Sequence, residues 1–235
     1  MYKLIELGGG VGGGGVLQGF LHEAERDGVR GQVRTGARAD GGAVVLTHGA
    51  GGNCESKLLV EVAEALAAAG FAVFRFDLPF RAERRTGPPM RGSADHDREG
   101  LRLAAALMKK RSARPVFLAG HSYGGRQASM LLAEAPDAAD GLLLLSYPLH
   151  PPRKPEELRT GHLAQVGKPA FFVHGTRDPF GTIEEMKMAV KLIPARHALQ
   201  EVEGAGHDLM VKRGVGDLGA RVAQEFLGFL GGERG

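Results

Sequence analysis

Ser122 lies in a setting that can turn a serine hydroxyl into a nucleophile. The apolar run 115–119 leads into the five-residue turn 120–124 (Gly-His-Ser-Tyr-Gly), and a segment rich in Ala, Leu and Met follows at once. A strand, a Gly-x-Ser-x-Gly turn and a helix in that order form a nucleophile elbow, which lifts the serine side chain clear of a sheet. The flanking glycines are needed because Cβ atoms would collide across so tight a turn. The pattern therefore predicts Ser122 as a covalent nucleophile.

A serine hydroxyl is a poor nucleophile without a base, and the sequence offers a base and an acid after two further apolar runs. His207 follows the run 197–202 and is the candidate base. Asp178 follows the run 170–174 and would hold the imidazole in the required tautomer and stabilise its charged form. The chain order Ser, Asp, His is the order that accompanies this type of elbow. Asp208 is an alternative acid, but it directly follows His207, and the side chains of adjacent residues point apart.

Each of these residues also has a structural interpretation when it is taken alone. Asp178 stands before Pro179 and could be an Asx-turn residue, and His207 could be a surface or helix-capping histidine. The coincidence of three such residues at three strand ends, in the order expected, favours a Ser122-Asp178-His207 triad.

The oxyanion of a tetrahedral intermediate needs backbone donors. We predict the N–H of Tyr123, directly after the nucleophile, and the N–H of Ala50, in the His-Gly-Ala-Gly-Gly turn 48–52. Loss of one such donor typically raises the barrier by about 3–4 kcal/mol. Four further residues are expected to contribute to the substrate pocket: His48, Gly49, His121 and Tyr147.

The elements that must position these residues alternate between strand and helix. Apolar runs predict strands at 43–47, 71–76, 115–119, 142–145, 170–174 and 197–202, with further short strands possible at 2–7 and 32–38. Helical spacing predicts helices at 56–69, 97–110, 123–135, 183–193 and 217–230, and Thr182 and Glu185 form a capping box before the fourth of them. This alternation is typical of an α/β fold with a mostly parallel sheet and helices on both faces. We expect a single domain over residues 21–235 without a large lid, preceded by a flexible glycine-rich segment over residues 1–20.

Composition narrows the class of function. The chain has 235 residues, 43% of them hydrophobic and 24% charged, and a net charge of +3. That charge is too mild, and its basic residues too dispersed, to indicate a nucleic-acid partner. The single cysteine, Cys54, excludes an internal disulfide and is read as a small buried apolar residue. Because we find neither a membrane-spanning run nor a signal peptide, we expect a cytoplasmic protein with a small-molecule substrate and no membrane partner.

Three patterns suggest ligand sites without establishing them. Residues 8–15 match a dinucleotide fingerprint, but a tract of seven glycines and one valine matches any glycine pattern, so we predict no cofactor site. The neighbours Asp95, His96 and Asp97 are better explained as a helix N-cap than as metal ligands, so we predict no metal. The arginines between Arg75 and Arg91 could form an anion-binding rim, but a solvated basic loop is favoured.

Together these motifs resemble the α/β-hydrolase superfamily, in particular its dienelactone-hydrolase-like members. A narrower resemblance is to the hydrolase-like family that contains a testis-expressed protein and a subunit of the non-specific-lethal chromatin complex. The stretches that carry both resemblances are His48–Gly52, Arg75–Pro79, Gly120–Arg126, Tyr147–Pro152, Gly175–Asp178 and Gly206-His207.

The resemblance implies a Ser-Asp-His hydrolase without a cofactor, and it leaves the substrate open. His121 and Tyr123 depart from the residues that relatives often carry beside the serine, which leaves the chemistry intact and alters the pocket. The leading hypothesis is cleavage of a small ester, thioester or related acyl compound through an acyl-enzyme on Ser122. The alternatives are a non-catalytic scaffold protein on the same fold, and a triad used for other chemistry such as C–C cleavage or halide-dependent oxidation.

Overall fold

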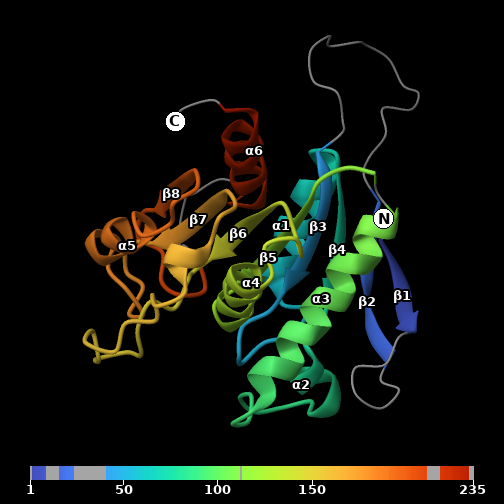
Figure 1. Cartoon of the computed structure of the whole chain (residues 1–235), viewed down its shortest axis with the longest axis horizontal. Helices are drawn as coiled ribbons and strands as arrows, with labels where there is room; N and C mark the ends of the chain where they lie inside the picture. The colour runs from blue at the N-terminus through green and yellow to red at the C-terminus, as the bar shows by residue number, and fades with distance from the viewer. Residues whose placement is uncertain (1, 9–15, 24–40, 112, 211–217, 233–235) are drawn as a thin grey trace.

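The computed structural model describes residues 2–8, 16–23, 41–111, 113–210 and 218–232. One eight-stranded sheet runs through the described chain in the order β1-β2-β4-β3-β5-β6-β7-β8 (Figure 1). The pairs from β4 to β8 are parallel, whereas β1 pairs antiparallel with β2, and β2 with β4. The strands are β1 (Tyr2–Gly8), β2 (Val16–His22), β3 (Gly42–Thr47), β4 (Phe71–Phe76), β5 (Val116–His121), β6 (Gly141–Leu145), β7 (Ala170–Gly175) and β8 (His197–Val202). The predicted, mostly parallel sheet is confirmed.

Helices cover both faces of this sheet (Figure 1). In β3, Val45 packs into the core on one face, while Val44 and Leu46 pack into the core on the other, as the two-residue period of a strand requires. The first face is covered by α3 (Ser93–Arg111), α4 (Tyr123–Glu134) and α5 (Ile183–Val190), and the second by α1 (Lys57–Ala68) and α6 (Leu218–Gly231). The short α2 (Pro79–Glu83) follows β4. The predicted capping box of Thr182 and Glu185 begins α5.

The N-terminal hairpin is part of the sheet. β2 pairs with β4 from Gly19 opposite Phe76 to His22 opposite Val73. The division that we expected between residues 20 and 21 therefore falls inside β2, and the strands of this hairpin are not a separate flexible segment. Residues 9–15 of the glycine tract and the predicted strand 32–38 lie outside the described residues.

The strand order reverses next to β3, and this reversal creates the place for a site. The chain passes from β3 to its neighbour β4 and then crosses to β5 on the other side of β3. At the carboxyl ends of the two strands, Thr47 lies opposite Gly120, so the turns that follow leave the sheet side by side. Ligands of open α/β sheets bind in the crevice at such a point. The connections within the described residues contain no inserted lid domain, as predicted.

Candidate active site

Ser122 occupies a strained turn between β5 and α4. Its φ is 50° and its ψ −115°, a conformation that residues with a Cβ rarely adopt. The turn is held by the Ser122 N–H, which donates to Leu145 O at 2.8 Å. A Cβ on Gly124 would lie 2.6 Å from His48 O, and one on Gly120 would lie 2.5 Å from the backbone N of Gly125. The glycines expected from the elbow motif are therefore required by backbone contacts on both sides of the serine.

His207 lies within hydrogen-bond distance of both other residues of the predicted triad. The Ser122 hydroxyl and His207 Nε2 are 2.8 Å apart, and His207 Nδ1 is 2.8 Å from Asp178 Oδ2. An ionised carboxylate only accepts, so Nδ1–H donates to Asp178 and Nε2 is left to accept the serine proton. Asp178 Oδ1 also accepts the Phe180 N–H at 2.8 Å, so Asp178 forms the Asx turn as well as the contact with His207 that a triad would need.

Close packing of two loops brings His207 to Asp178. A Cβ on Gly175, at the end of β7, would lie 2.4 Å from Ala205 O, so only glycine lets the histidine loop pass this closely. The Arg177 N–H donates to the same carbonyl at 2.9 Å. Phe180 stacks on the His207 ring with 4.1 Å between ring centroids. These contacts fix the height and the tilt of the imidazole above the sheet.

His121 ties the elbow to the histidine loop. Its Nε2–H donates to His207 O at 2.8 Å. Burial lowers the pKa of His121, so the ring is neutral at pH 7 and donates through this single N–H. We describe His121 as a positioning residue, since it contacts His207 through the backbone.

The two residues predicted to supply oxyanion donors lie in the wall of a pocket beside Ser122. Ala50 and Tyr123 both line it. Within the part of the chain that the structure describes, neither the Ala50 N–H nor the Tyr123 N–H donates to another group. Two unpaired N–H groups in the wall beside Ser122 are what an oxyanion developing there would require.

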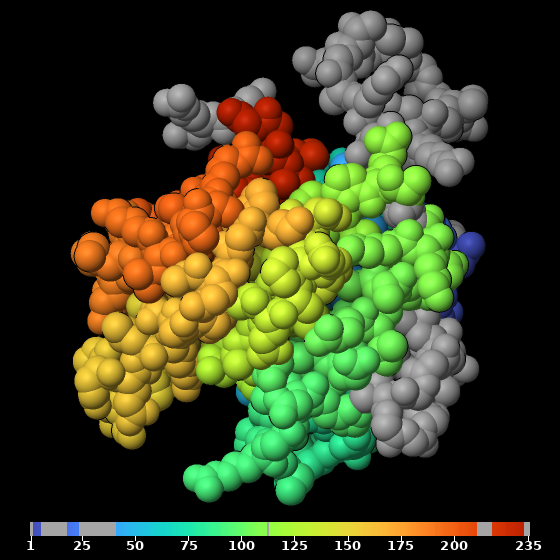
Figure 2. Space-filling view, in the orientation of Figure 1, coloured from blue at the N-terminus to red at the C-terminus, as the bar shows by residue number. Residues whose placement is uncertain are grey.

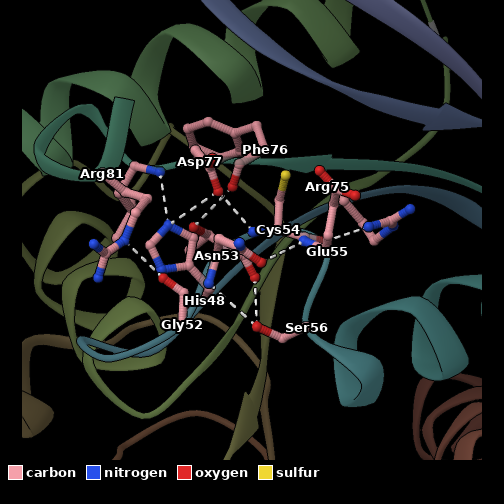
Figure 3. A network of polar contacts seen from close by, with 12 residues as sticks. His48, Gly52, Asn53, Cys54, Glu55, Ser56, Arg75, Phe76, Asp77 and Arg81 are labelled. Atoms are coloured by element: carbon pink, nitrogen blue, oxygen red, sulfur yellow. Dashed lines mark hydrogen bonds and ion pairs between the residues drawn. The ribbon is translucent and has the colours of Figure 1, made fainter. Parts of the chain in front are cut away.

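Arg81 braces the turn that carries Ala50. Its side chain is buried and donates to two carbonyls of the turn, Nη2 to Ala50 O at 2.9 Å and Nε to Gly52 O at 2.8 Å. Figure 3 shows Arg81 beside His48, whose Nδ1–H donates to Gly49 O at 2.8 Å. Because a guanidinium presents its donors in a fixed fork, it can hold both carbonyls at once.

A second network holds Cys54, two residues after the same turn (Figure 3). Asp77 Oδ1 accepts the Cys54 N–H at 2.6 Å, and Arg75 donates to Cys54 O. Arg75 also donates to His22 Nε2 at 2.8 Å, which connects the turn to the N-terminal hairpin. Burial raises the pKa of the Cys54 thiol to about 12, so it stays protonated and is no rival nucleophile.

A buried carboxylate anchors Tyr123. The phenol donates to Asp97 Oδ2 at 2.7 Å, and Asp97 Oδ1 accepts the Phe80 N–H at 3.0 Å. Burial raises the pKa of Asp97, and burial together with the hydrogen bond to Asp97 raises the pKa of Tyr123. The helix N-cap that we predicted for residues 95–97 is wrong, because α3 already begins at Ser93. Asp97 instead holds Tyr123, the residue directly after Ser122.

A pocket of about 790 Å³ opens beside Ser122. Gly49 and His121 line it, as predicted, but His48 and Tyr147 do not. Both are buried: His48 Nε2 accepts the Leu78 N–H at 3.1 Å, and the Tyr147 hydroxyl donates to Arg159 O at 2.7 Å. These two predictions are wrong because both side chains form hydrogen bonds with backbone groups and do not line the pocket. In Figure 2 the segment 147–163 (yellow to orange) and the segment after α2 (green) project on the same side of the molecule, with a hollow between them.

The family profile described as "Alpha/beta hydrolase domain" matches residues 40–227. The chain belongs to this family. The dienelactone hydrolase from Anabaena variabilis shares the fold, with a TM-score of 0.72, 21% identity and 98% of each chain covered. Est1E from Butyrivibrio proteoclasticus gives a TM-score of 0.69 at 17% identity, covering 97% of this chain and 99% of its own. XC6422 from Xanthomonas campestris, an α/β serine hydrolase without a lid, gives 0.60 at 16% identity, covering 88% and 86%.

The arginines of this family member differ from what the sequence suggested. Arg75 and Arg81 are buried in the networks described above, and the interpretation of a solvated basic loop is wrong for them. Arg126 and Arg159 line the pocket, and no motif had marked them as site residues. The spacing of Arg126, one helical turn after Ser122, is the only sequence signal that could have found either of them. Among the described residues, no group of three or more His, Cys, Asp or Glu side chains is arranged to hold a metal ion.

Proposed function

We propose that this protein is a serine hydrolase that cleaves a small ester, thioester or related acyl substrate through an acyl-enzyme on Ser122. The observation that carries the proposal is the hydrogen-bonded chain from Ser122 Oγ through His207 to Asp178, with both distances at 2.8 Å, at the edge of an open pocket. Membership of the alpha/beta hydrolase family supports a hydrolase.

The geometry supplies a group for each step. Ser122 Oγ attacks the acyl carbon while His207 Nε2 takes its proton, and Asp178 stabilises the imidazolium. The oxyanion accepts from the N–H groups of Ala50 and Tyr123. His207 then returns the proton to the departing alcohol or thiol, which leaves an ester on Ser122. A water molecule, deprotonated by His207, attacks this ester and releases the acid.

Several names among the structural neighbours support an ester as the substrate class. They include the dienelactone hydrolase and an esterase domain from Rhodothermus marinus. The narrower resemblance to a chromatin-complex subunit favours the second candidate, a non-catalytic scaffold. The intact contacts of Ser122 and His207 weigh against that candidate, because a scaffold has no need of them.

The proposed setting is a cytoplasmic enzyme acting on a small molecule, without nucleic acid. Within the described helices, none is long and apolar enough to cross a membrane.

A fluorophosphonate probe tests the proposal. Wild-type protein should become labelled and Ser122→Ala should not. Ser129→Ala is a matched control, because the Ser129 hydroxyl also lies 2.8 Å from a histidine nitrogen, that of His162, but is fully buried and outside the pocket. We expect this control to label like wild type. Absence of labelling in folded wild-type protein, or full labelling of Ser122→Ala, would refute the proposal.

A further inference from the structure

Two arginines from separate elements share the wall of the pocket. Arg126 lies in the first turns of α4, and its backbone N–H donates to Ser122 O at 2.9 Å. Arg159 comes from the connection between β6 and β7. Residues one helical turn apart have Cβ atoms about 6 Å apart, so the Arg126 side chain starts close to the nucleophile.

Among the residues that the structure describes, neither arginine forms an ion pair with an acidic side chain; Glu157, whose charge acts on Arg159, is itself paired with Lys154. Arg126 Nε is fully buried and makes no hydrogen bond. The Arg159 guanidinium has one long contact, from Nη1 to Pro148 O at 3.4 Å. A buried donor such as Arg126 Nε is costly, because it has lost water without gaining an acceptor.

The two guanidinium groups also act on each other. Burial lowers the pKa of Arg159, and the positive charge of Arg126 lowers it further. Two like charges that line one pocket repel, and a bound anion relieves this repulsion and supplies acceptors at once. Of the other charged groups on this wall, Lys57 is exposed and pairs with Glu61, and Asp208 is exposed on the side of the catalytic histidine.

Hydrogen bonds to their backbone groups hold both arginines in place. The Arg159 N–H donates to Leu149 O at 2.8 Å, and Arg159 O accepts from Tyr147. Arg126 O accepts the Ser129 hydroxyl at 2.8 Å, and Ser129 contacts His162 at the far end of the same connection. Both side chains therefore start from backbone that is fixed by hydrogen bonds, as a specificity site requires.

We infer that Arg126 and Arg159 bind an anionic group of the substrate, and that this group is a carboxylate. The inference rests on the proposed function and specifies its substrate class: an acyl compound with a second, ionised carboxyl group a short chain away from the scissile carbonyl. Two guanidinium forks match the planar oxygens of a carboxylate. A phosphate offers the same anionic chemistry, so the test separates the two.

The test compares mono-4-nitrophenyl adipate with methyl 4-nitrophenyl adipate, two esters whose far carboxyl group is ionised in the first and methylated, hence neutral, in the second. We expect wild-type kcat/KM to be at least about tenfold higher for the anionic ester, which is the order of magnitude of one charged hydrogen bond. Arg126→Gln and Arg159→Gln should each lower this ratio about tenfold, mainly through KM. Arg153→Gln is the matched control, since Arg153 is exposed on the same connection and outside the pocket, and it should leave the ratio unchanged.

Failure of the inference and failure of the proposed function give different results. A wild-type ratio near one with clear turnover of the neutral ester would overturn the inference and leave the hydrolase in place. If neither ester is cleaved, calorimetry on Ser122→Ala protein decides: tighter binding of monomethyl adipate than of dimethyl adipate, lost in Arg126→Gln, would uphold the anion site without the activity. Equal binding of both would overturn the site. Inhibition by inorganic phosphate at tenfold lower concentration than by adipate would overturn the assignment to a carboxylate.

Discussion

Replacing Arg81 by methionine would remove a buried fork of hydrogen-bond donors while keeping most of the apolar stem. The Arg81 side chain donates to Ala50 O and Gly52 O in the turn 48–52. It also donates to Arg84 O and Gly87 O in the segment after α2. The residue itself is only 5% exposed. The substitution would therefore remove the hydrogen bonds by which the Arg81 side chain joins these two segments.

The expected cost follows from which carbonyls lose their partner. Arg84 and Gly87 are exposed, so water can replace the guanidinium there. Ala50 and Gly52 are half-buried, and a hydrogen bond to a charged group contributes about 1.5–3 kcal/mol. We therefore expect the free energy of unfolding to fall by about 3–5 kcal/mol. In a chain of this size each kcal/mol lowers Tm by about 2–4 °C, so the shift should be about 10 °C.

Activity should fall as well, because the turn that Arg81 braces carries the Ala50 N–H. A misplaced oxyanion donor costs up to about 3 kcal/mol of barrier, or about 100-fold in kcat, with little change in KM. Arg81→Lys keeps the charge but has one nitrogen in place of the fork, so we expect it to recover only part of both losses.

The assays are thermal unfolding and hydrolysis of a neutral 4-nitrophenyl ester at a temperature where every variant is folded. Arg84→Met is the control, since this neighbouring arginine is exposed and should change the free energy of unfolding by less than about 0.5 kcal/mol. If Arg81→Met melted within 2 °C of wild type and kept its kcat within about twofold, the role that we assign to this network would be wrong.

Three further predictions concern the elbow and the buried histidines. Gly124→Ala places a Cβ 2.6 Å from His48 O, so we expect loss of nucleophile labelling and a destabilisation of about 2–4 kcal/mol, measured by denaturant unfolding; wild-type labelling would contradict it. His121→Leu removes the donor to His207 O and should lower kcat about tenfold, while His121→Gln, which keeps an N–H donor, should recover much of it; equal rates in both variants would speak against a positioning role. Burial, and then the charge of Arg126, lowers the pKa of His162 to about 4, so the unfolded chain binds protons more readily than the folded chain below about pH 6.5. The free energy of unfolding should therefore fall between pH 6.5 and 4, and fall less in His162→Gln; an equal fall in both would exclude His162 as a source.

Local motifs in the sequence were enough to predict the elbow, the capping box, the buried strands and the fold class. The elbow around Ser122 could be predicted from the sequence because its glycines are required by a turn of neighbouring residues. The capping box could be predicted because Thr182 and Glu185 are only three positions apart. The buried parallel strands are readable because each is a compact apolar run bounded by turn residues. Alternation of those strands with helices implied the fold class, and with it the edge of the sheet where Ser122, Asp178 and His207 were expected to meet.

Tertiary structure decided the features that depend on residues far apart in the chain. Arg81 reaches carbonyls 29 and 31 residues away, and Arg75 reaches His22 across 53 residues. No periodicity signals that an arginine after a strand will be buried, because its burial depends on acceptors that the other loops supply. Asp97 is the same case, since its partners Phe80 and Tyr123 belong to two other helices.

The N-terminal hairpin and the wall of the pocket also depend on contacts between distant parts of the chain. Glycine-rich composition indicated a flexible start, but β2 pairs with β4 because β4 presents an otherwise unpaired edge, which the composition of residues 1–20 does not reveal. Arg126 and Arg159 are 33 positions apart and become one feature only when the connection after β6 folds back over α4. The sequence by itself determined the fold class and the chain order in which the strands carry Ser122, Asp178 and His207 to one edge of the sheet. Folding decided which charges lose water beside them, because desolvation depends on the whole surrounding surface and not on neighbours in the chain.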